Sequence, residues 1–245
     1  MLMKCRFTGQ TDPGLVRSAN QDSYYCDPDG RFFIVADGMG GHAGGEEASR
    51  IAVETIQQYL EANWESPESS EDLLETALIK ANEAILADQL DNPARQDMGT
   101  TAVMVLFRGD HVWRAHVGDS RLYSFRGDTL IQVTGDHTWV SQAVQSGDIT
   151  AEQAKVHPWR HVLSQCLGRK DLSLIDLATL EIHSGDRLLL CSDGLTEEVD
   201  DSEIQFILSA NDDLDQAAAA LIETAKDNGG SDNVTVVLVQ VEAAS

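Results

Sequence analysis

Five aspartate residues of this chain each stand in a short Gly-rich or polar turn, and the turns are spread over the whole sequence. Several of these turns follow or precede an apolar run that is typical of a β-strand. Carboxylate oxygens are the ligands that hard divalent cations such as Mg²⁺ and Mn²⁺ take. Strand ends from distant parts of a chain meet only in a folded sheet, so the pattern predicts a metal site that tertiary structure assembles, of the kind that catalyses hydrolysis. The five residues are Asp22, Asp37, Asp119, Asp193 and Asp232.

Taken singly, each of these turns is weak evidence for chemistry. Asp-Gly is a frequent turn dipeptide, so Asp37-Gly38 or Asp193-Gly194 alone is explained by a plain turn. The prediction of a metal site therefore depends on the five turns occurring together, several of them at the ends of expected strands.

Hydrophobic periodicity indicates the elements that must position the turns. Residues with i, i+3, i+4 spacing predict amphipathic helices over residues 48–59, 69–85 and 214–225. Residues 38–41 are too rich in glycine for regular structure to be expected, and residues 136–168 are irregular and weakly helical in pattern. Short apolar runs predict strands at residues 6–11, 31–36, 101–107, 111–117, 121–125, 129–133, 187–191 and 234–241.

The order of these elements indicates the fold class. A strand, a helix pair, a β-meander, an insertion, a strand, a helix and a final strand fit an α+β domain with antiparallel sheets and helices outside. The sequence contains no internal repeat, low-complexity segment or interdomain linker. Residues 1–245 are therefore predicted to form a single domain.

Composition argues against several functional classes. The formal net charge is -24, and such a surface repels nucleic acid and anionic membranes. No apolar run is long enough for a membrane span, and residues 1–6 lack the apolar stretch of a secretory signal. The four cysteines show no paired spacing, which argues against zinc or disulfide frameworks and fits a reducing compartment. We expect a cytoplasmic monomer that binds neither nucleic acid nor membranes.

Seven short motifs follow one another along the chain: Arg17-x-x-Asn20-Gln21-Asp22, Val35-Ala36-Asp37-Gly38-Met39-Gly40-Gly41-His42, Gly99-Thr100-Thr101-Ala102, Val117-Gly118-Asp119-Ser120-Arg121, Thr134-x-Asp136-His137, Ser192-Asp193-Gly194-Leu195 and Asp232-Asn233-Val234-Thr235. In this order they resemble the metal-dependent protein phosphatase family of type 2C, in its compact bacterial form. The resemblance covers nearly the whole chain. The sequence is most similar to small cyanobacterial members that act on the phosphorylated PII nitrogen-signalling protein, which makes that protein a candidate partner.

The resemblance implies an architecture and an activity. The fold would be a four-layer α-β-β-α sandwich of two antiparallel sheets flanked by helix pairs, with metals in a cleft at one edge. Residues 136–168 would form a flap beside that cleft. The activity would be hydrolysis of phosphoserine and phosphothreonine in proteins, by direct attack of a water that bridges two metals.

The resemblance also implies a set of metal ligands. Asp37 would bridge two Mg²⁺ or Mn²⁺ ions, with the Gly38 carbonyl on the second. Asp193 and Asp232 would hold the first ion. Asp119 would be the ligand of a third, weaker ion, which shares Asp193.

Three polar residues receive supporting roles on the same basis. Asp22 would orient metal-bound water, and Asn233 would buttress Asp232. Arg17 would clamp the phosphate, because a guanidinium can fork onto two phosphoryl oxygens. Without the resemblance, Arg17 is explained as a surface arginine that follows a turn.

One position departs from the pattern of some family members. Those members have a histidine directly after Asp-Gly, proposed to protonate the leaving oxygen, and this chain has Met39 there. The acid would then be a water on the third metal, His42, or none. His42 is equally explained as a residue that caps the Gly-rich turn.

The expected flap carries positive charge in an otherwise acidic chain. Arg160, His161 and Arg169 are therefore candidates for recognising acidic or phosphorylated substrate surfaces. Trp139 and Trp159 are expected to pack within the flap.

Two alternatives to a protein phosphatase stay open. One is a catalytically silent module that keeps the fold to bind a phosphoprotein, which would be marked by a lost metal ligand. None of the four aspartate ligands named above is lost. The other is hydrolysis of a small phosphorylated metabolite, which the composition of the flap does not argue against.

Overall fold

Two antiparallel sheets stack face to face in the computed structural model, which describes residues 4–242 except for the side chains of residues 42 and 43. The strands are β1 Cys5–Asp12, β2 Asp22–Cys26, β3 Phe32–Met39, β4 Gly99–Thr100, β5 Ala102–Arg108, β6 His111–Val117, β7 Arg121–Arg126, β8 Thr129–Gln132, β9 Asp176–Leu180, β10 Arg187–Cys191 and β11 Val234–Val241. The helices are α1 Gly41–Asn63, α2 Ser70–Asp91, α3 Trp139–Gln145, α4 Ala151–Lys155, α5 Asp193–Thr196, α6 Asp201–Ala210 and α7 Leu214–Asp227, with a 3-10 turn at Pro93–Arg95.

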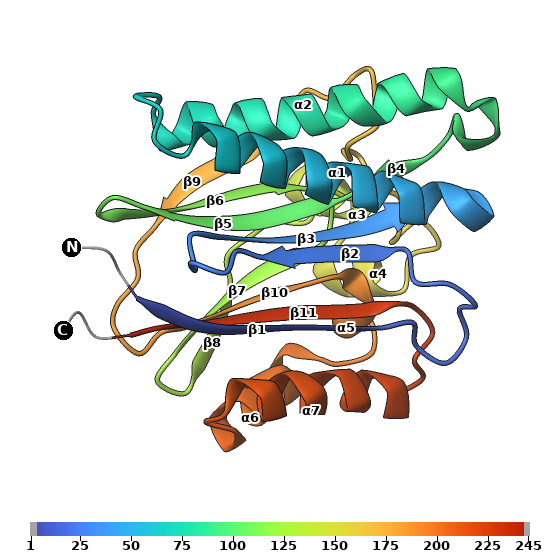
Figure 1. The fold of residues 1–245 in the computed structure, drawn as a ribbon. Helices are drawn as coiled ribbons and strands as arrows, with labels where there is room; N and C mark the ends of the chain where they lie inside the picture. The colour runs from blue at the N-terminus through green and yellow to red at the C-terminus, as the bar shows by residue number, and fades with distance from the viewer. Residues whose placement is uncertain (1–3, 243–245) are drawn as a thin grey trace.

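The four layers of the molecule follow from how these elements pack. One sheet has the order β1-β11-β10-β7-β8, and the other has the order β2-β3-β5-β6-β9 with β4 beside β3. Helices α1 and α2 cover the outer face of the second sheet, and α6 and α7 cover that of the first (Figure 1). The predicted α-β-β-α sandwich of antiparallel sheets is confirmed.

Three apolar clusters hold the layers together. Between the sheets, Phe33 of β3, Val105 of β5 and Val237 of β11 are buried in a common cluster. Alternate residues of the same strands point outward, so Ile34 packs under α1 and α2 while Leu238 packs under α6 and α7. Because successive side chains of a strand alternate between its two faces, a strand covered on both sides is apolar throughout. This explains the continuous apolar runs that predicted these strands.

Local signals in the sequence explain where helix α2 begins and ends. The Ser69 hydroxyl accepts a hydrogen bond from the Asp72 N–H (3.0 Å), which satisfies one of the free donors of the first turn. The helix ends at Asp91, ahead of Pro93. The start near Ser69 was predicted from the sequence, and the helix extends six residues beyond the predicted end at residue 85.

The structure differs from the expectation at the Gly-rich segment 38–41. Strand β3 continues through Met39, and α1 begins at Gly41, so only Gly40 lies between them. Gly40 has a φ of 119°, which favours glycine. The segment is a tight strand-to-helix connection, and the glycines allow it because they lack side chains.

Several elements were not predicted. Strands β2 and β9 and helix α6 are formed by partly polar segments whose periodicity is short or interrupted. Pairing with neighbouring strands decides β2 and β9, because β2 lies beside β3 and β9 lies beside β6, whereas α6 is held by packing of its apolar residues under the first sheet.

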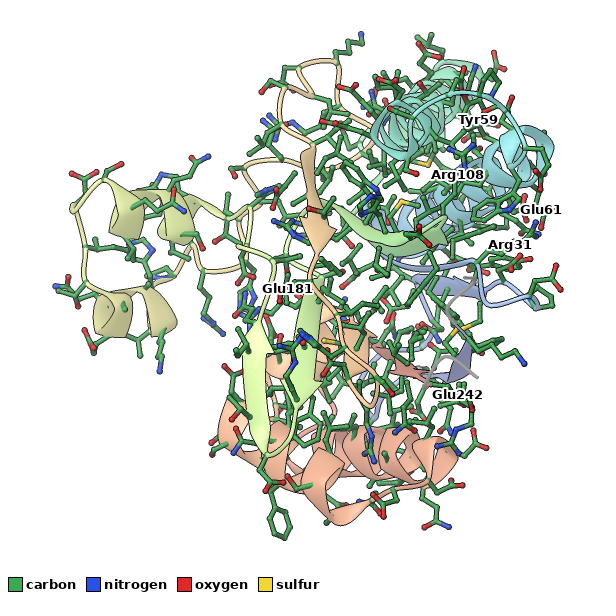
Figure 2. All side chains as sticks on the ribbon, turned by 90° about the vertical axis from the view of Figure 1, so that its left-hand side faces the viewer. Arg31, Tyr59, Glu61, Arg108, Glu181 and Glu242 are labelled. Carbon is green, nitrogen blue, oxygen red and sulfur yellow. The ribbon has the colours of Figure 1, made fainter. Side chains whose placement is uncertain are left out.

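Residues 136–168 contain more helix than the sequence indicated, and the segment returns to the core at Leu167, which pairs with Thr100. Helices α3 and α4 start directly after Thr138 and Thr150, whose side chains cap them. Figure 2 shows these two pale yellow helices standing out from the side of the sandwich. Trp139 packs against both His157 and Trp159, with ring centroids 4.9 and 5.0 Å apart, so the flap has a small aromatic core of its own.

Within residues 4–242, no helix combines the length and the apolar character needed to cross a membrane.

Candidate active site

A cavity of about 500 Å³ lies at the end of the sandwich where the carboxylate turns meet. These turns lie on the right in Figure 1. Strand β1 runs from the N-terminus on the left toward them, and β11 runs from them back to the C-terminus on the left. The cavity is lined by all five predicted metal ligands, together with Arg17 and two flap residues. The ligands are Asp37, Gly38, Asp119, Asp193 and Asp232, and the flap residues are His161 and Leu163.

Each ligand reaches the cavity from a different element. Asp37 lies near the end of β3, and Asp119 lies in the turn between β6 and β7. Asp193 is the first residue of α5, directly beyond β10, and Asp232 precedes β11. Because the sheets are antiparallel and stacked, the ends of β3, β6 and β10 and the start of β11 all lie at one end of the sandwich.

Gly38 is required by the close approach of α1 to β3. A Cβ atom on Gly38 would collide with the carbonyl oxygen of Gly45, and a Cβ on Gly45 would lie 2.6 Å from the Gly38 carbonyl oxygen. The absence of side chains lets the main chain of Gly38 line the cavity.

Hydroxyl groups fix the backbone around Asp37. The Asp37 N–H donates to Thr101 Oγ1 (3.0 Å), and Thr100 Oγ1 donates to the Asp37 carbonyl (2.8 Å). Thr101 Oγ1 also shares a hydrogen bond of 2.6 Å with Ser120 Oγ, next to Asp119. Two carboxylate-bearing segments from different strands are thereby tied to one threonine.

Asp22 lies directly opposite Asp37 in the β2–β3 pair. Its Oδ2 accepts hydrogen bonds from Ser192 (2.7 Å) and Thr235 (2.6 Å), whereas its buried Oδ1 has no partner among the residues that the structure describes. Burial raises the pKa of Asp22 to about 7, and repulsion by Asp193 adds to that increase.

Three other carboxylates of the site also have raised pKa values. Burial, and then repulsion by Asp22 and Asp193, raises the pKa of Asp37 well above its ordinary value. Burial and the charge of Asp193 do the same to the pKa of Asp119, and burial raises the pKa of Asp193. Carboxylates so close together are stabilised by divalent cations, and the buried Oδ1 of Asp22 offers one more oxygen beside them. The residues therefore fit a metal centre with oxygen ligands.

Arg17 is held close to one of the ligands. Its Nη2 lies 2.6 Å from Asp232 Oδ2, and its side chain is 51% exposed. The loop that carries Arg17 is fixed by Asn233, whose Oδ1 accepts from the Gln21 N–H (2.7 Å) and whose Nδ2 donates to the Ala19 carbonyl (2.9 Å). The Asn233 N–H donates to Asp232 Oδ1 (2.8 Å), so the contact with the ligand comes from the main chain while the side chain secures the loop.

The predicted flap residues are divided between two places. His161 reaches the cavity, and its Nδ1 lies 2.5 Å from Glu197 Oε1. Arg160 is exposed next to it in the sequence, and its charge acts on Glu197. Arg169 is not among the residues that line the cavity and instead pairs with Asp171 (2.9 Å).

The side chain of His42 lies outside the described residues, so its expected role is not addressed by the structure.

Glu197 is a polar residue of the site that sequence reasoning missed. One oxygen of Glu197, one of Asp193 and a nitrogen of His161 lie within 4.8 Å of one another. Burial, and then repulsion by Asp193 and Asp232, raises the pKa of Glu197 to about 7. The signal was available, because Glu197 follows Asp193 by four residues and such a spacing puts both on one side of a helical turn.

Comparison with known proteins agrees with this arrangement. The family model of protein phosphatase 2C matches residues 16–238. The chain belongs to the protein phosphatase 2C family.

Two relatives within the protein phosphatase 2C family show how far the likeness extends. Serine/threonine protein phosphatase PstP of Mycobacterium tuberculosis is 39% identical over 239 residues, which is 96% of this chain and 45% of PstP. Protein phosphatase PhpP of Streptococcus pneumoniae is 36% identical over 236 residues, which is 94% of this chain and 95% of PhpP. The chain thus spans less than half the length of PstP and nearly all of PhpP.

Solved structures of the protein phosphatase 2C family share the fold. The crystal structure of PstP superposes with a TM-score of 0.91 at 38% identity, and covers 99% of this chain and 100% of that one. The catalytic domain of PstP in complex with two manganese ions superposes with a TM-score of 0.86 at 36% identity, and covers 98% of this chain and 100% of that one.

Proposed function

We propose that the chain is a divalent-cation-dependent protein phosphatase, which hydrolyses phosphoserine and phosphothreonine in proteins. The observation that carries the proposal is the gathering of four carboxylates and Arg17 around one cavity in a member of the protein phosphatase 2C family. Two relatives that are 39% and 36% identical are named as protein phosphatases.

The proposal assigns two cations to the core of the site and a third to its edge. Asp37 would bridge the core pair, with the Gly38 carbonyl on one ion and Asp193 and Asp232 on the other. Asp119, with a share of Asp193, would hold the third. Oxygen-only donors suit Mg²⁺ or Mn²⁺, and the PstP structure with two manganese ions supports two ions in the core.

The chemistry divides between the cations and the chain. When bound, the cations would supply a nucleophile by lowering the pKa of a water, and would offset the charge of the phosphate. Asp22 would accept a hydrogen bond at its unpartnered Oδ1 and so orient that nucleophile. Arg17 would bind two phosphoryl oxygens and hold the phosphorus atom in line for attack.

Hydrolysis of p-nitrophenyl phosphate tests the proposal. We expect turnover with Mn²⁺ or Mg²⁺ that is lost in EDTA, and a loss of at least about 100-fold in Asp193→Ala, because even residues that only support metal ligands cost up to about that much. Circular dichroism checks that the variant is folded. If folded wild-type protein hydrolysed no p-nitrophenyl phosphate with any metal, the proposed phosphatase activity would be refuted. The alternative of a module that binds phosphoproteins without hydrolysing them would then remain.

The substrate is proposed to be a phosphoprotein, with the PII nitrogen-signalling protein as the first candidate. The flap supports a protein substrate, because His161 lines the acidic cavity and the charge of its neighbour Arg160 acts on Glu197. We expect Arg160→Ala and His161→Ala to raise KM for a phosphopeptide more than for p-nitrophenyl phosphate. Arg169→Ala is the matched control, since Arg169 pairs with Asp171 outside the lining of the cavity.

Comparison of substrate classes completes this test. Faster turnover of sugar phosphates than of phosphopeptides would favour a metabolite phosphatase instead. We further propose a cytoplasmic monomer, in keeping with the acidic surface and the unpaired cysteines, and light scattering of the purified protein measures its oligomeric state.

A further inference from the structure

The turn between β6 and β7 carries Asp119 but has little regular structure to hold it. Gly118, directly before Asp119, has a φ of 113°, and a Cβ atom there would lie 2.5 Å from Thr101 Cγ2. A carboxylate that binds a cation has to be held within about 0.5 Å of its working position. The hydrogen bond between Ser120 and Thr101 fixes one side of this turn, and the rest of it has to be held by other parts of the molecule.

Two consecutive residues at the base of the flap hold the turn at both ends. His137 grips Gly118 twice: its N–H donates to the Gly118 carbonyl (2.8 Å), and its Nδ1 accepts from the Gly118 N–H (3.2 Å). Asp136 grips Arg121, whose Nε and Nη2 donate to its two carboxylate oxygens (2.9 and 2.7 Å). Asp119 lies between these two attachment points.

The surroundings of His137 favour a ring that accepts a hydrogen bond. His137 is buried, and burial lowers its pKa, so the ring is neutral near pH 7 and Nδ1 is free to accept. Its ring centroid lies 4.5 Å from that of the fully buried His116, which fixes its orientation by packing.

We infer that Asp136 and His137 are positioning residues, which fix the turn of Asp119 and thereby set the affinity of the site for the cation that Asp119 holds. The inference rests on the proposed metal centre and deepens it. It explains the Asp136-His137 motif, although neither of these residues is among those that line the cavity. The two residues act through Gly118 and Arg121.

Binding of Mn²⁺ tests this role without any reference to turnover. Free Mn²⁺ is measured by electron paramagnetic resonance, which gives the number of sites and their Kd values for the wild type, Asp119→Ala and His137→Phe. Phenylalanine keeps a ring in the pocket but removes the acceptor. We expect Asp119→Ala to abolish the weakest site, and His137→Phe to weaken that site alone by about two- to tenfold, as the loss of one hydrogen bond implies.

The double variant Asp119→Ala/His137→Phe separates positioning from general support of the fold. If His137 acts through Asp119, the double variant binds Mn²⁺ like Asp119→Ala alone. An additional loss in that background, an equal weakening of all sites by His137→Phe, or no change at the weakest site would overturn the inference. His111→Phe, exposed at the opposite end of β6, is the control and should bind like the wild type.

A second pair of variants covers the case in which His137→Phe does not fold. Asparagine at position 137 keeps an acceptor at the δ position, and glutamine moves it one bond further. We expect His137→Asn to bind Mn²⁺ at the weakest site more tightly than His137→Gln, and equal affinities would refute the inference. Absence of hydrolysis together with this dependence on position 137 would refute the phosphatase but uphold the positioning role.

Discussion

At the scale of single residues, Arg17 has two possible anions to bind. Its guanidinium pairs with Asp232 at 2.6 Å, and its side chain is 51% exposed. An exposed ion pair of this kind contributes little, about 0–1 kcal/mol. Under the proposed function, Arg17 would leave Asp232 at small cost once a cation neutralises that carboxylate, and would then bind a doubly charged phosphate.

This exchange predicts the kinetics of Arg17→Ala. We expect KM for a phosphopeptide to rise by about tenfold, the worth of one charge-assisted contact, with a smaller change in kcat. Arg17→Lys should recover part of the loss, because lysine supplies the charge without the fork. Steady-state kinetics at saturating Mn²⁺ measures both effects.

The matched control for Arg17 is Arg6→Ala, an exposed arginine that bonds Gln240 on β11. It should behave like the wild type. A large fall in kcat at unchanged KM for Arg17→Ala would instead place Arg17 only in stabilisation of the transition state.

At the scale of elements, the loop between β1 and β2 is fastened to the start of β11. Asn233 is almost fully buried and bonds three main-chain groups of that loop, the carbonyls of Pro13 and Ala19 and the N–H of Gln21. These hydrogen bonds fix the loop, and with it the position of the Arg17 main chain, relative to the start of β11.

We predict that removal of the Asn233 side chain reduces both the stability of the fold and the binding of substrate. We expect Asn233→Ala to lower the free energy of unfolding by about 2–4 kcal/mol, because three hydrogen bonds are lost and buried groups stay unpaired. This corresponds to a Tm lower by roughly 5–10 °C for a chain of this size. KM should rise as well, since Arg17 is no longer held, and thermal unfolding in EDTA with kinetics in Mn²⁺ measures both.

The control for this anchor is Asn228→Ala, whose side chain bonds the Glu198 carbonyl at an exposed helix end. Its effect should stay below about 1 kcal/mol. Equal losses in the two variants, or an unchanged KM in Asn233→Ala, would contradict the role of the anchor.

At the scale of the whole molecule, the formal net charge is -24, and part of this negative charge is gathered around the cavity. Folding raises the pKa of Asp22, Asp37, Asp119 and Asp193. The cation-free folded state then binds more protons than the unfolded state between about pH 4 and pH 7, so these groups reduce stability as the pH rises through that range. Cations bind only after the protons leave.

The stabilisation by Mg²⁺ or Mn²⁺ should therefore increase with pH. We expect Tm to differ little between EDTA and cation at about pH 5, and by about 5–10 °C at about pH 8, where a cation at 100 times its Kd contributes about 2.7 kcal/mol. The buried His116 and His137 have lowered pKa values and act in the opposite direction, but they affect both conditions alike.

Differential scanning fluorimetry over this pH range measures the difference directly. The control is Asp193→Asn, in which the dependence on cation should be much flatter. A difference in Tm that is constant from about pH 5 to pH 8 would show that these carboxylates are already ionised in the folded state.

The sequence alone determined the chemical types and their order along the chain. Asp37 and Asp193 were found because Asp-Gly turns follow strongly apolar strands, and those strands were found because both of their faces are buried. The order of those runs indicated an α+β domain with antiparallel sheets and outer helices, and the family resemblance implied the four-layer sandwich. Local patterns carry this information, since it depends only on residue type and on neighbours in sequence.

Only the tertiary structure decided which residues meet. Arg169, which the sequence grouped with His161, instead pairs with Asp171 two residues further along the chain. Three contacts join segments that are distant in sequence: Glu197 with His161, Asn233 with the loop between β1 and β2, and His137 with Gly118. Such contacts depend on the packing of whole layers, and no periodicity within one segment encodes them.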